Sequence, residues 1–368
     1  MAPRTPHPAL RTLLVVTGDP GGARVLIPAI GELKRRHPRW RFKILAGSNS
    51  RRLWSTAGFR PRRWPASRLN RKQCSNILIR TGPDVLVTGT SFENPTESWF
   101  RQAAREAAIA SFSALDHWCN YRRRYEAGRK LILPDVIGVM DDLARKKMIQ
   151  AGIPRLLLAV VGHPVLEPVL KRQKVRSRAS RQILFLSEPV SWDGKLDPKV
   201  VRHPGHNELT VLKSLLSVFV QYPELRRHSL RIRPHPLEPL VRLKKVLREH
   251  TPRGLRVTID GGRSLERDFA SSRVVLGITS IALLQGRLMG KPVLSLQPDH
   301  ARGRIPDDIL CFLPRVRSNG CFIEAVSNFV RTRQTKGRSF NIGSRPRLPR
   351  NSKRRIANEI EKLIEIGE

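Results

Sequence analysis

Residues with chemical potential follow several apolar runs of this sequence. After the run at residues 13–17 comes a glycine-rich turn that contains Gly18, Asp19 and Gly21. The glycines allow close backbone approach, and a helix N-terminus behind them favours an anion. Because the Asp19 carboxylate would repel a bound phosphate, it suits contact with an acceptor hydroxyl. A plain tight turn explains the glycines equally well, so both interpretations stay open here.

A basic cluster follows a later apolar run. It contains Arg231, Arg233 and His235, and Pro234 and Pro236 flank the histidine. Guanidinium groups match the geometry of phosphate oxygens, and proline fixes the backbone. We interpret this cluster as a preorganised anion site, with an exposed basic turn as the alternative.

Two hydroxyl residues, Thr279 and Ser280, stand where an apolar run gives way to a helical pattern. A serine or threonine at a helix N-terminus caps the helix, and the free N–H groups beside it can bind a phosphate. Capping alone explains both hydroxyls. The pair gains weight because it follows His235 at the equivalent edge of the same predicted sheet.

Three carboxylates of the first half are candidates for a general base. Asp19 lies in the glycine-rich turn, Glu93 lies in the loop 91–97, and Asp116 begins the segment 116–121, which also holds a histidine and two aromatic residues. A carboxylate at a strand end can accept the proton of a sugar hydroxyl. One base is enough, and spacing does not choose among the three.

These segments need a scaffold, and the alternation of apolar runs with helical patterns predicts one. Strands are expected at 13–17, 41–46, 83–89, 109–112, 182–186, 229–233, 255–259, 274–277 and 292–296, with helices between them. Such alternation is typical of two doubly wound parallel sheets, which bind ligands at the carboxyl ends of their strands. We therefore predict an α/β protein with two Rossmann-like domains that face a cleft.

The predicted domain limits follow the same pattern. An N-terminal domain is expected at 1–165 and a nucleotide-sugar domain at 182–350, joined by the basic linker 166–181 and followed by a C-terminal helix at 351–368. A chain of 368 residues also exceeds the usual size of a single core. The two criteria agree on two domains.

The composition indicates a protein of the cytoplasm. The cysteines at 74, 119, 311 and 321 form no C-x-x-C pair, which suits a reducing compartment. No signal peptide and no apolar stretch of membrane-spanning length is evident. A net charge of +39 predicts attraction to phosphate-rich partners.

Part of this charge is local. Residues 51–72 combine eight basic residues with Trp54, Phe59 and Trp64 and contain no acid, and residues 331–355 are also basic. Aromatic rings suit the headgroup boundary, and basic residues suit anionic lipid. We therefore predict peripheral attachment to an anionic membrane such as the inner membrane. A soluble enzyme whose arginines only keep it dispersed is the alternative.

The second half resembles the nucleotide-binding domain of GT-B glycosyltransferases. His235 and Pro236 match the His-Pro motif, and Thr279 and Ser280 the Ser motif, of the group that includes bacterial sialyltransferases, Kdo transferases, polysialyltransferases and CDP-glycerol-type polymerases. Residues 288–293 and 161–166 resemble two further segments of such chains, so that the likeness covers about half of the chain. The resemblance implies that the two motifs bind nucleotide phosphates.

The sequence departs from that group in two places. Asp141 and Asp142 are followed by Leu143 and not by the glycine of the sialyltransferase base motif, and Gln285 stands where many relatives have a ribose-binding glutamate. The donor nucleotide and the base therefore stay open.

Together these features predict metal-independent transfer of a sugar or polyol phosphate from a nucleotide-activated donor to an envelope glycan or lipid-linked acceptor. No cofactor is expected, and no Asp-x-Asp metal signature is evident. The alternatives are a UDP-sugar 2-epimerase of the same fold and a basic nucleic-acid-binding protein. The absence of a recognisable nucleic-acid motif argues against the second alternative.

Overall fold

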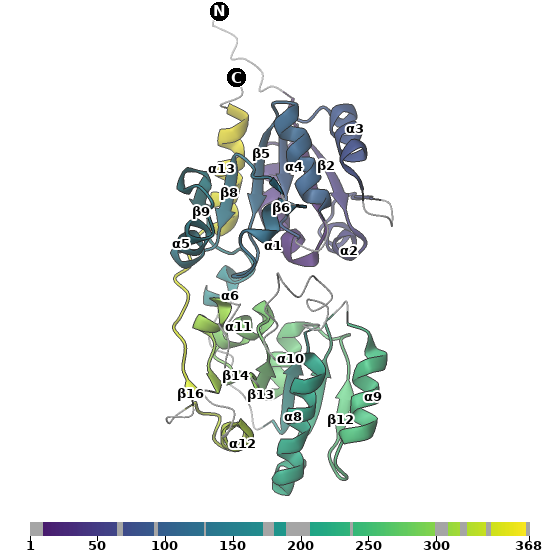
Figure 1. The fold of residues 1–368 in the computed structure, drawn as a ribbon, viewed down its shortest axis with the longest axis vertical. Helices are drawn as coiled ribbons and strands as arrows, with labels where there is room; N and C mark the ends of the chain where they lie inside the picture. Colours follow the sequence, from purple (N-terminus) through teal and green to yellow (C-terminus); the bar gives the residue numbers. More distant parts are fainter. Residues whose placement is uncertain are drawn as a thin grey trace, which may run out of the picture. The chain divides into compact units, whose positions relative to one another are not determined.

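A computed structural model describes residues 10–64, 69–91, 95–128, 130–171, 180–188, 207–235, 238–298, 308–316, 322–335 and 340–365. The chain divides into two compact units. The first comprises residues 1–168 and 347–368, and the second comprises residues 169–346. Each unit is built on its own sheet (Figure 1).

The first unit contains a seven-stranded sheet in the order β3-β2-β1-β4-β5-β8-β9. All its neighbouring strands pair in parallel. The strands are β1 (Thr12–Thr17), β2 (Arg41–Ala46), β3 (Arg62–Arg63), β4 (Val85–Thr88), β5 (Ala110–Ala114), β8 (Val136–Val139) and β9 (Leu158–Val160), and a small hairpin is formed by β6 (Glu126–Ala127) and β7 (Lys130–Leu131). The helices are α1 (Pro20–Arg36), α2 (Ser48–Thr56), α3 (Arg71–Thr81), α4 (Thr96–Glu106), α5 (Asp142–Gln150) and α13 (Ser352–Glu365), with 3-10 turns η1 (Arg123–Tyr125) and η2 (Arg155–Leu157). The short helix α6 (Glu167–Lys171) contains the boundary between the two units.

Helices cover both faces of this sheet. Alternate side chains of β1 separate the two cores: Leu13 and Val15 pack with α1, α2 and α13, whereas Leu14 and Val16 pack with α3 and α4. This alternation follows from the two-residue period of a strand. The last helix, α13, belongs to the first unit, because Ile356 and neighbouring apolar residues of its buried face join the core around α1.

The second unit contains a seven-stranded sheet in the order β12-β11-β10-β13-β14-β15-β16, in which only the pair β15–β16 is antiparallel among the pairings of the described residues. The strands are β10 (Gln182–Leu186), β11 (Ser229–Arg233), β12 (Val257–Ile259), β13 (Ser272–Gly277), β14 (Val293–Ser295), β15 (Arg315–Val316) and β16 (Phe340–Asn341). The helices are α8 (Glu208–Gln221), α9 (Leu240–His250), α10 (Leu265–Ser271), α11 (Ile281–Leu288) and α12 (Phe322–Thr332), with η3 (Pro223–Arg227) and η4 (Asp308–Phe312).

Strands β10, β11, β13 and β14 bury one face against α8, α9 and α12, with Phe185, Phe219 and Phe329 among the core residues. On the other face, α10 and α11 approach each other closely: a side chain at Gly286 would contact the ring of Phe269. The prediction of two doubly wound α/β domains is confirmed.

The aromatic residues of the basic segment 51–72 are placed differently from the prediction. Trp54 is fully buried and donates from Nε1 to Thr17 Oγ1 at 2.8 Å, and Trp64 is also buried. These rings fill the cores of the first unit because burying a large apolar surface is favourable. The expectation that they face lipid is therefore wrong.

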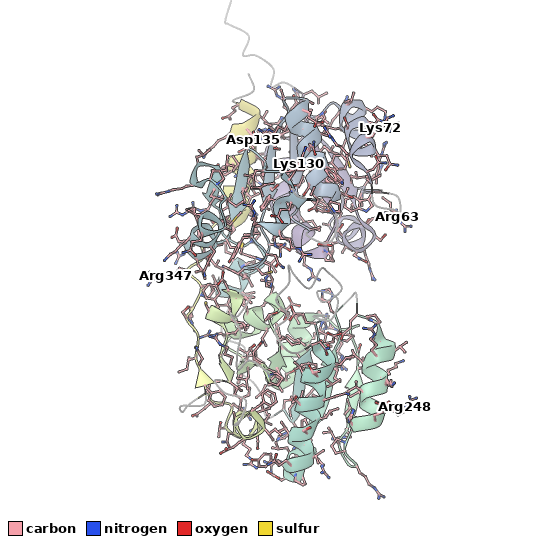
Figure 2. All side chains as sticks on the ribbon, viewed as in Figure 1. Arg63, Lys72, Lys130, Asp135, Arg248 and Arg347 are labelled. Carbon is pink, nitrogen blue, oxygen red and sulfur yellow. The ribbon has the colours of Figure 1, made fainter. Side chains whose placement is uncertain are left out.

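The basic residues of this segment that the structure describes lie on the surface. Arg63 and Lys72 extend from the first unit, and Arg248 extends from the second (Figure 2). Attachment to an anionic membrane consequently stays a prediction that rests on charge alone. None of the helices in the described ranges has the length and apolar character needed to cross a bilayer.

Candidate functional site

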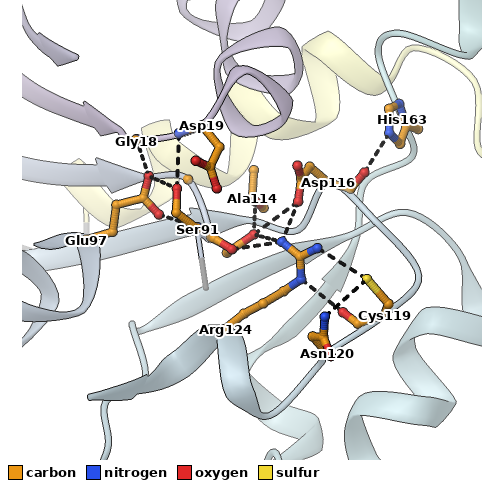
Figure 3. Close-up of polar contacts among 12 residues, drawn as sticks. Gly18, Asp19, Ser91, Glu97, Ala114, Asp116, Cys119, Asn120, Arg124 and His163 are labelled. Carbon is orange, nitrogen blue, oxygen red and sulfur yellow. Dashed lines mark hydrogen bonds and ion pairs between the residues drawn. The ribbon is translucent and has the colours of Figure 1, made fainter. Parts of the chain in front are cut away.

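The carboxyl ends of β1, β4 and β5 bring together residues that are far apart in the sequence (Figure 3). Asp19 follows β1, Ser91 follows β4 and Asp116 follows β5. The Ser91 Oγ lies 3.1 Å from the Asp19 amide nitrogen, which donates to it. Adjacent parallel strands place these loops at one edge, as the sequence predicted for Asp19 and Asp116. The third candidate base, Glu93, lies outside the described residues.

Arg124 is the cation at the centre of this edge. Its Nη1 donates to Asp116 Oδ1 at 2.8 Å and to the Thr90 carbonyl at 2.8 Å, and its Nε donates to the Cys119 carbonyl at 2.9 Å. Burial opposes its charge, but nearby Asp116, Cys119 and Asp19 outweigh burial and raise the pKa of Arg124. Arg124 therefore stays charged and fixes one oxygen of Asp116.

A second buried arginine holds Arg124 in place. Arg101, on α4, donates from Nη2 to the Arg124 carbonyl at 3.1 Å and to Ser98 Oγ at 2.7 Å. Its Nε donates to the Ile132 carbonyl at 3.2 Å. Arg101 thus connects α4, η1 and the segment after β7, and it supports the loop that carries Arg124.

The other oxygen of Asp116 explains one of the predicted glycines. A Cβ on Gly21 would lie 1.9 Å from Asp116 Oδ2, so only glycine leaves room for this carboxylate at the start of α1. No described residue forms a hydrogen bond with Oδ2, and the Asp116 side chain is 15% exposed. The first turn of α1 therefore receives a carboxylate of the protein itself. The interpretation of Gly18 and Gly21 as phosphate-binding residues is weakened, because a phosphate there would meet Asp116 and Asp19.

Glu97 is a buried carboxylate that the sequence did not single out as a site residue. Its Oε1 accepts from the Gly18 amide at 2.7 Å, and its Oε2 accepts from the Ser91 amide at 2.6 Å. Desolvation and the charge of Asp19 raise the pKa of Glu97 to about 7. Glu97 joins the β1 and β4 loops and can change its protonation state near neutral pH.

His163 supports the Asp116 loop from the opposite side. Its Nε2 lies 3.2 Å from the Asp116 carbonyl, and because a carbonyl oxygen only accepts, Nε2 is the donor. Its ring stacks on Trp118 with centroids 5.9 Å apart. Burial lowers the pKa of His163 to about 4, so the ring is neutral at pH 7.

This edge can therefore perform acid–base chemistry. Asp116 offers one oxygen held by a cation and one oxygen with no hydrogen bond to a described residue, and the pKa of the buried Glu97 is raised to about 7. Carboxylates in unlike surroundings take different roles in proton transfer. Glu97, Arg124 and His163 were not among the predicted site residues because each contacts a loop distant in sequence. The local signal for Glu97 is its place in the first turn of α4, shortly after β4.

In the second unit, the predicted phosphate arginines have acidic partners. Arg231 forms ion pairs with Asp260 and, at 3.1 Å, with Asp268, and Arg233 pairs with Asp268 at 2.5 Å. Asp268 is fully buried between the two guanidinium groups. These pairs neutralise the arginines, so the arginines are less available to a phosphate than their sequence context implied.

The neighbouring loop is fixed by two glutamates. Glu238 accepts from the His235 amide at 3.1 Å and from Ser187 Oγ at 2.7 Å. Glu188 accepts from the Thr279 amide at 2.8 Å and from the Thr279 hydroxyl at 3.1 Å. His235 is thus positioned at the carboxyl edge of β11, while its partner Pro236 lies outside the described residues.

Ser280 caps α11 by accepting from the Leu283 amide at 3.2 Å. Its hydroxyl is therefore explained by capping, and phosphate binding by Thr279 and Ser280 stays a prediction. Across the ranges that the structure describes, no three His, Cys, Asp or Glu side chains are grouped so that they could hold a metal ion.

Solved structures share this fold at low sequence identity. The S. aureus MnaA–UDP complex has a TM-score of 0.67 and 12% identity, over 97% of this chain and 98% of that one. UDP-GlcNAc 2-epimerase from Neisseria meningitidis, bound to UDP-GlcNAc, has a TM-score of 0.67 and 15% identity, over 95% and 100% of the two chains. MurG from Acinetobacter baumannii has a TM-score of 0.54 and 10% identity, over 96% and 99%.

No protein-family model matches the chain, and no curated protein sequence matches it. The chain therefore shares the two-domain GT-B type of fold with these solved structures. They do not support the finer resemblance to the sialyltransferase-like His-Pro group.

Proposed function

We propose that this chain is a nucleotide-sugar enzyme that inverts carbon 2 of a UDP-linked sugar without an acceptor. We thus place 2-epimerisation before the glycosyl transfer that the sequence analysis expected. The observation that carries the proposal is the pair of dissimilar carboxylates at the carboxyl edge of the first sheet: Asp116, held by Arg124, and Glu97, whose pKa is about 7.

The proposal follows from what inversion requires. A base must take the proton from carbon 2 while the bond between carbon 1 and the UDP oxygen breaks and UDP leaves with the electron pair. An acid must then return a proton to the opposite face of carbon 2 as UDP forms its bond to carbon 1 again, so the reaction needs a base and an acid. Asp116 Oδ2 is open to a ligand and serves as the contact group, whereas Glu97 acts through the loops of Gly18 and Ser91. The structures with the same fold include UDP-GlcNAc 2-epimerases, which supports a UDP-sugar as the first substrate to test.

Glycosyl transfer is the second candidate. The resemblance of His235 and Thr279–Ser280 to the motifs of GT-B transferases favours it. Asp116 would serve as the base in either reaction, so that residue does not distinguish them. The two reactions are distinguished by the acceptor, which transfer requires and epimerisation does not.

The test is incubation with UDP-GlcNAc in deuterated buffer without acceptor, followed by proton NMR. Epimerisation predicts loss of the carbon-2 proton signal and appearance of the 2-epimer. Asp116→Asn should slow this about 100-fold or more. Asp142→Asn, an exposed carboxylate on α5 of the same unit, is the control and should keep the rate. UDP release that requires an added glycan acceptor, without proton exchange at carbon 2, would favour glycosyl transfer. Turnover of Asp116→Asn at the normal rate would contradict both epimerisation and transfer with Asp116 as the base.

A further inference from the structure

The amino edge of the second sheet carries a row of basic residues. In the spatial order β11-β10-β13-β14, His228 precedes β11, Arg181 precedes β10, Arg273 is the second residue of β13, and Lys291 stands two residues before β14. Neighbouring strands lie about 4.8 Å apart. Every one of these four strands therefore adds a cationic or titratable nitrogen group to the same edge, opposite to the edge with His235.

Lys291 is the most informative member of this row. Its side chain is 4% exposed, and its Nζ has no hydrogen-bond partner among the described residues. Burial of an ammonium group without a partner is costly, and burial lowers the pKa of Lys291. An anion or another hydrogen-bond acceptor bound to Lys291 Nζ would offset this cost.

The backbone places Arg273 beside Lys291. The Val275 amide donates to the Pro292 carbonyl at 2.9 Å, and Val275 pairs with Val293, so Arg273 and Lys291 hold equivalent positions on adjacent strands. Arg273 donates to the carbonyls of Val330 at 3.0 Å and Arg331 at 2.7 Å, at the end of α12.

Arg333 completes the group, which we call the Lys291 cluster (Arg273, Lys291 and Arg333). It follows α12 with φ of 59°, and its amide donates to the Phe329 carbonyl at 2.8 Å. After burial, its charge is the next influence that lowers the pKa of both Arg273 and Lys291, so Arg333 lies close enough to repel each of them. None of the three forms an ion pair within the described part of the chain, whereas Arg331 pairs with Glu224.

His228 extends the same pattern. Its Nδ1 lies 3.2 Å from the Arg181 carbonyl and must donate to it, which leaves Nε2 buried and without a partner among the residues that the structure describes. Burial and the charges of Arg273 and Arg227 lower the pKa of His228. His228 Nε2 is thus a second buried nitrogen on this edge that has no hydrogen-bond partner among the described residues.

We propose that the Lys291 cluster is a second anion site, which binds a phosphate group at the amino edge of the second sheet. A phosphate oxygen would accept from Lys291 Nζ, and its charge would offset the repulsion of Arg333 with Arg273 and with Lys291. Arg181, which precedes β10 on the same edge, would widen the site for a ligand with more than one phosphate. Because β10 and β13 separate this edge from the His235 loop by the length of a strand, this site is separate from the predicted nucleotide site.

The test measures thermal unfolding of the full chain with increasing inorganic phosphate, at ionic strength kept constant with chloride. Wild-type protein should show a melting temperature that rises with phosphate concentration. Lys291→Met keeps the length of the side chain and removes the buried charge, so it should raise the melting temperature without phosphate and abolish most of the phosphate response. Lys213→Met, an exposed lysine of α8, is the control and should keep the response.

Arg333→Gln, on the less buried side of the cluster, provides a second variant if Lys291→Met does not fold. It should reduce the phosphate response at least severalfold. Phosphatidylcholine vesicles with added phosphatidic acid form the other arm. Vesicle binding that is lost in the cluster variants identifies a lipid headgroup as the source of the phosphate, and a response to free phosphate without vesicle binding identifies a soluble ligand. An equal phosphate response in wild type and both cluster variants, together with equal vesicle recovery, would overturn the proposal.

Discussion

Gly21→Ala tests whether Asp116 is held at the start of α1 as the structure places it. The new Cβ would lie 1.9 Å from Asp116 Oδ2 and 3.1 Å from its Cγ. The carboxylate must therefore swing away and release Arg124, whose side chain is only 6% exposed. Gly31→Ala in the same helix is the matched control, because a Cβ there meets nothing within 4 Å.

The expected magnitudes follow from two opposing effects. Alanine stabilises a helix by about 0.5–1 kcal/mol relative to glycine. Loss of a charge-assisted hydrogen bond at a buried arginine costs about 1.5–3 kcal/mol. Gly21→Ala should therefore lower the free energy of unfolding by about 1–2 kcal/mol, whereas Gly31→Ala should raise it by about 0.5–1 kcal/mol.

A double-mutant cycle isolates the clash. In an Asp116→Ala background the obstructing carboxylate is absent, so Gly21→Ala should become stabilising, as at Gly31. Tryptophan fluorescence during urea unfolding suits this measurement, since all tryptophans except Trp192 belong to the first unit. If Gly21→Ala and Gly31→Ala change stability alike, or if the effect of Gly21→Ala is the same with and without Asp116, the placement of Asp116 is wrong.

Two further predictions concern buried charges. The pKa of Glu97 is about 7 in the folded protein and ordinarily 4.5, so the stability that protonated Glu97 contributes is lost as pH rises from about 4.5 to 7. The pKa of His163 is about 4 in the folded protein and ordinarily 6.5, so the stability that neutral His163 contributes is lost as pH falls from about 6.5 to 4. The two groups change stability in opposite directions with pH, and each variant keeps only one of them. Glu97→Gln should therefore lose stability on acidification, and His163→Gln should gain it, as measured by urea unfolding at about pH 5 and 7. Parallel pH trends in the two variants would refute the assignment. In the second unit, Asp268→Asn should cost about 3–5 kcal/mol because it removes the buried charge that Arg231 and Arg233 share. Asp260→Asn, at a side chain that is 39% exposed, should cost about 1 kcal/mol or less. Equal melting temperatures of the two variants would show that burial does not decide the strength of these pairs.

The sequence by itself determined the fold class. Runs such as 13–17 and 182–186 are the buried strands β1 and β10, and the alternation of strands with helices gave the two parallel sheets. These signals are local, because strand and helix periods are properties of neighbouring residues. The same logic placed Asp19, Asp116 and His235 at carboxyl edges, since each directly follows a strand.

Only the tertiary structure decided which charges have partners. The sequence does not reveal an acidic partner of Arg231 or Arg233, but Asp268, more than thirty residues later, lies between them. Glu97 reaches the Gly18 amide because β1 and β4 are adjacent, although the two residues are 79 positions apart. Strand order, which local patterns do not encode, sets these contacts.

The same distinction applies to the basic segment 51–72. Its aromatic residues suit a membrane surface by type, but Trp54 and Trp64 are buried in the first unit while the described arginines around them are exposed. Sequence specifies which side chains are apolar or charged. Packing decides which of them meet water, because the apolar surface that a ring can bury depends on helices and strands brought to it from elsewhere in the chain.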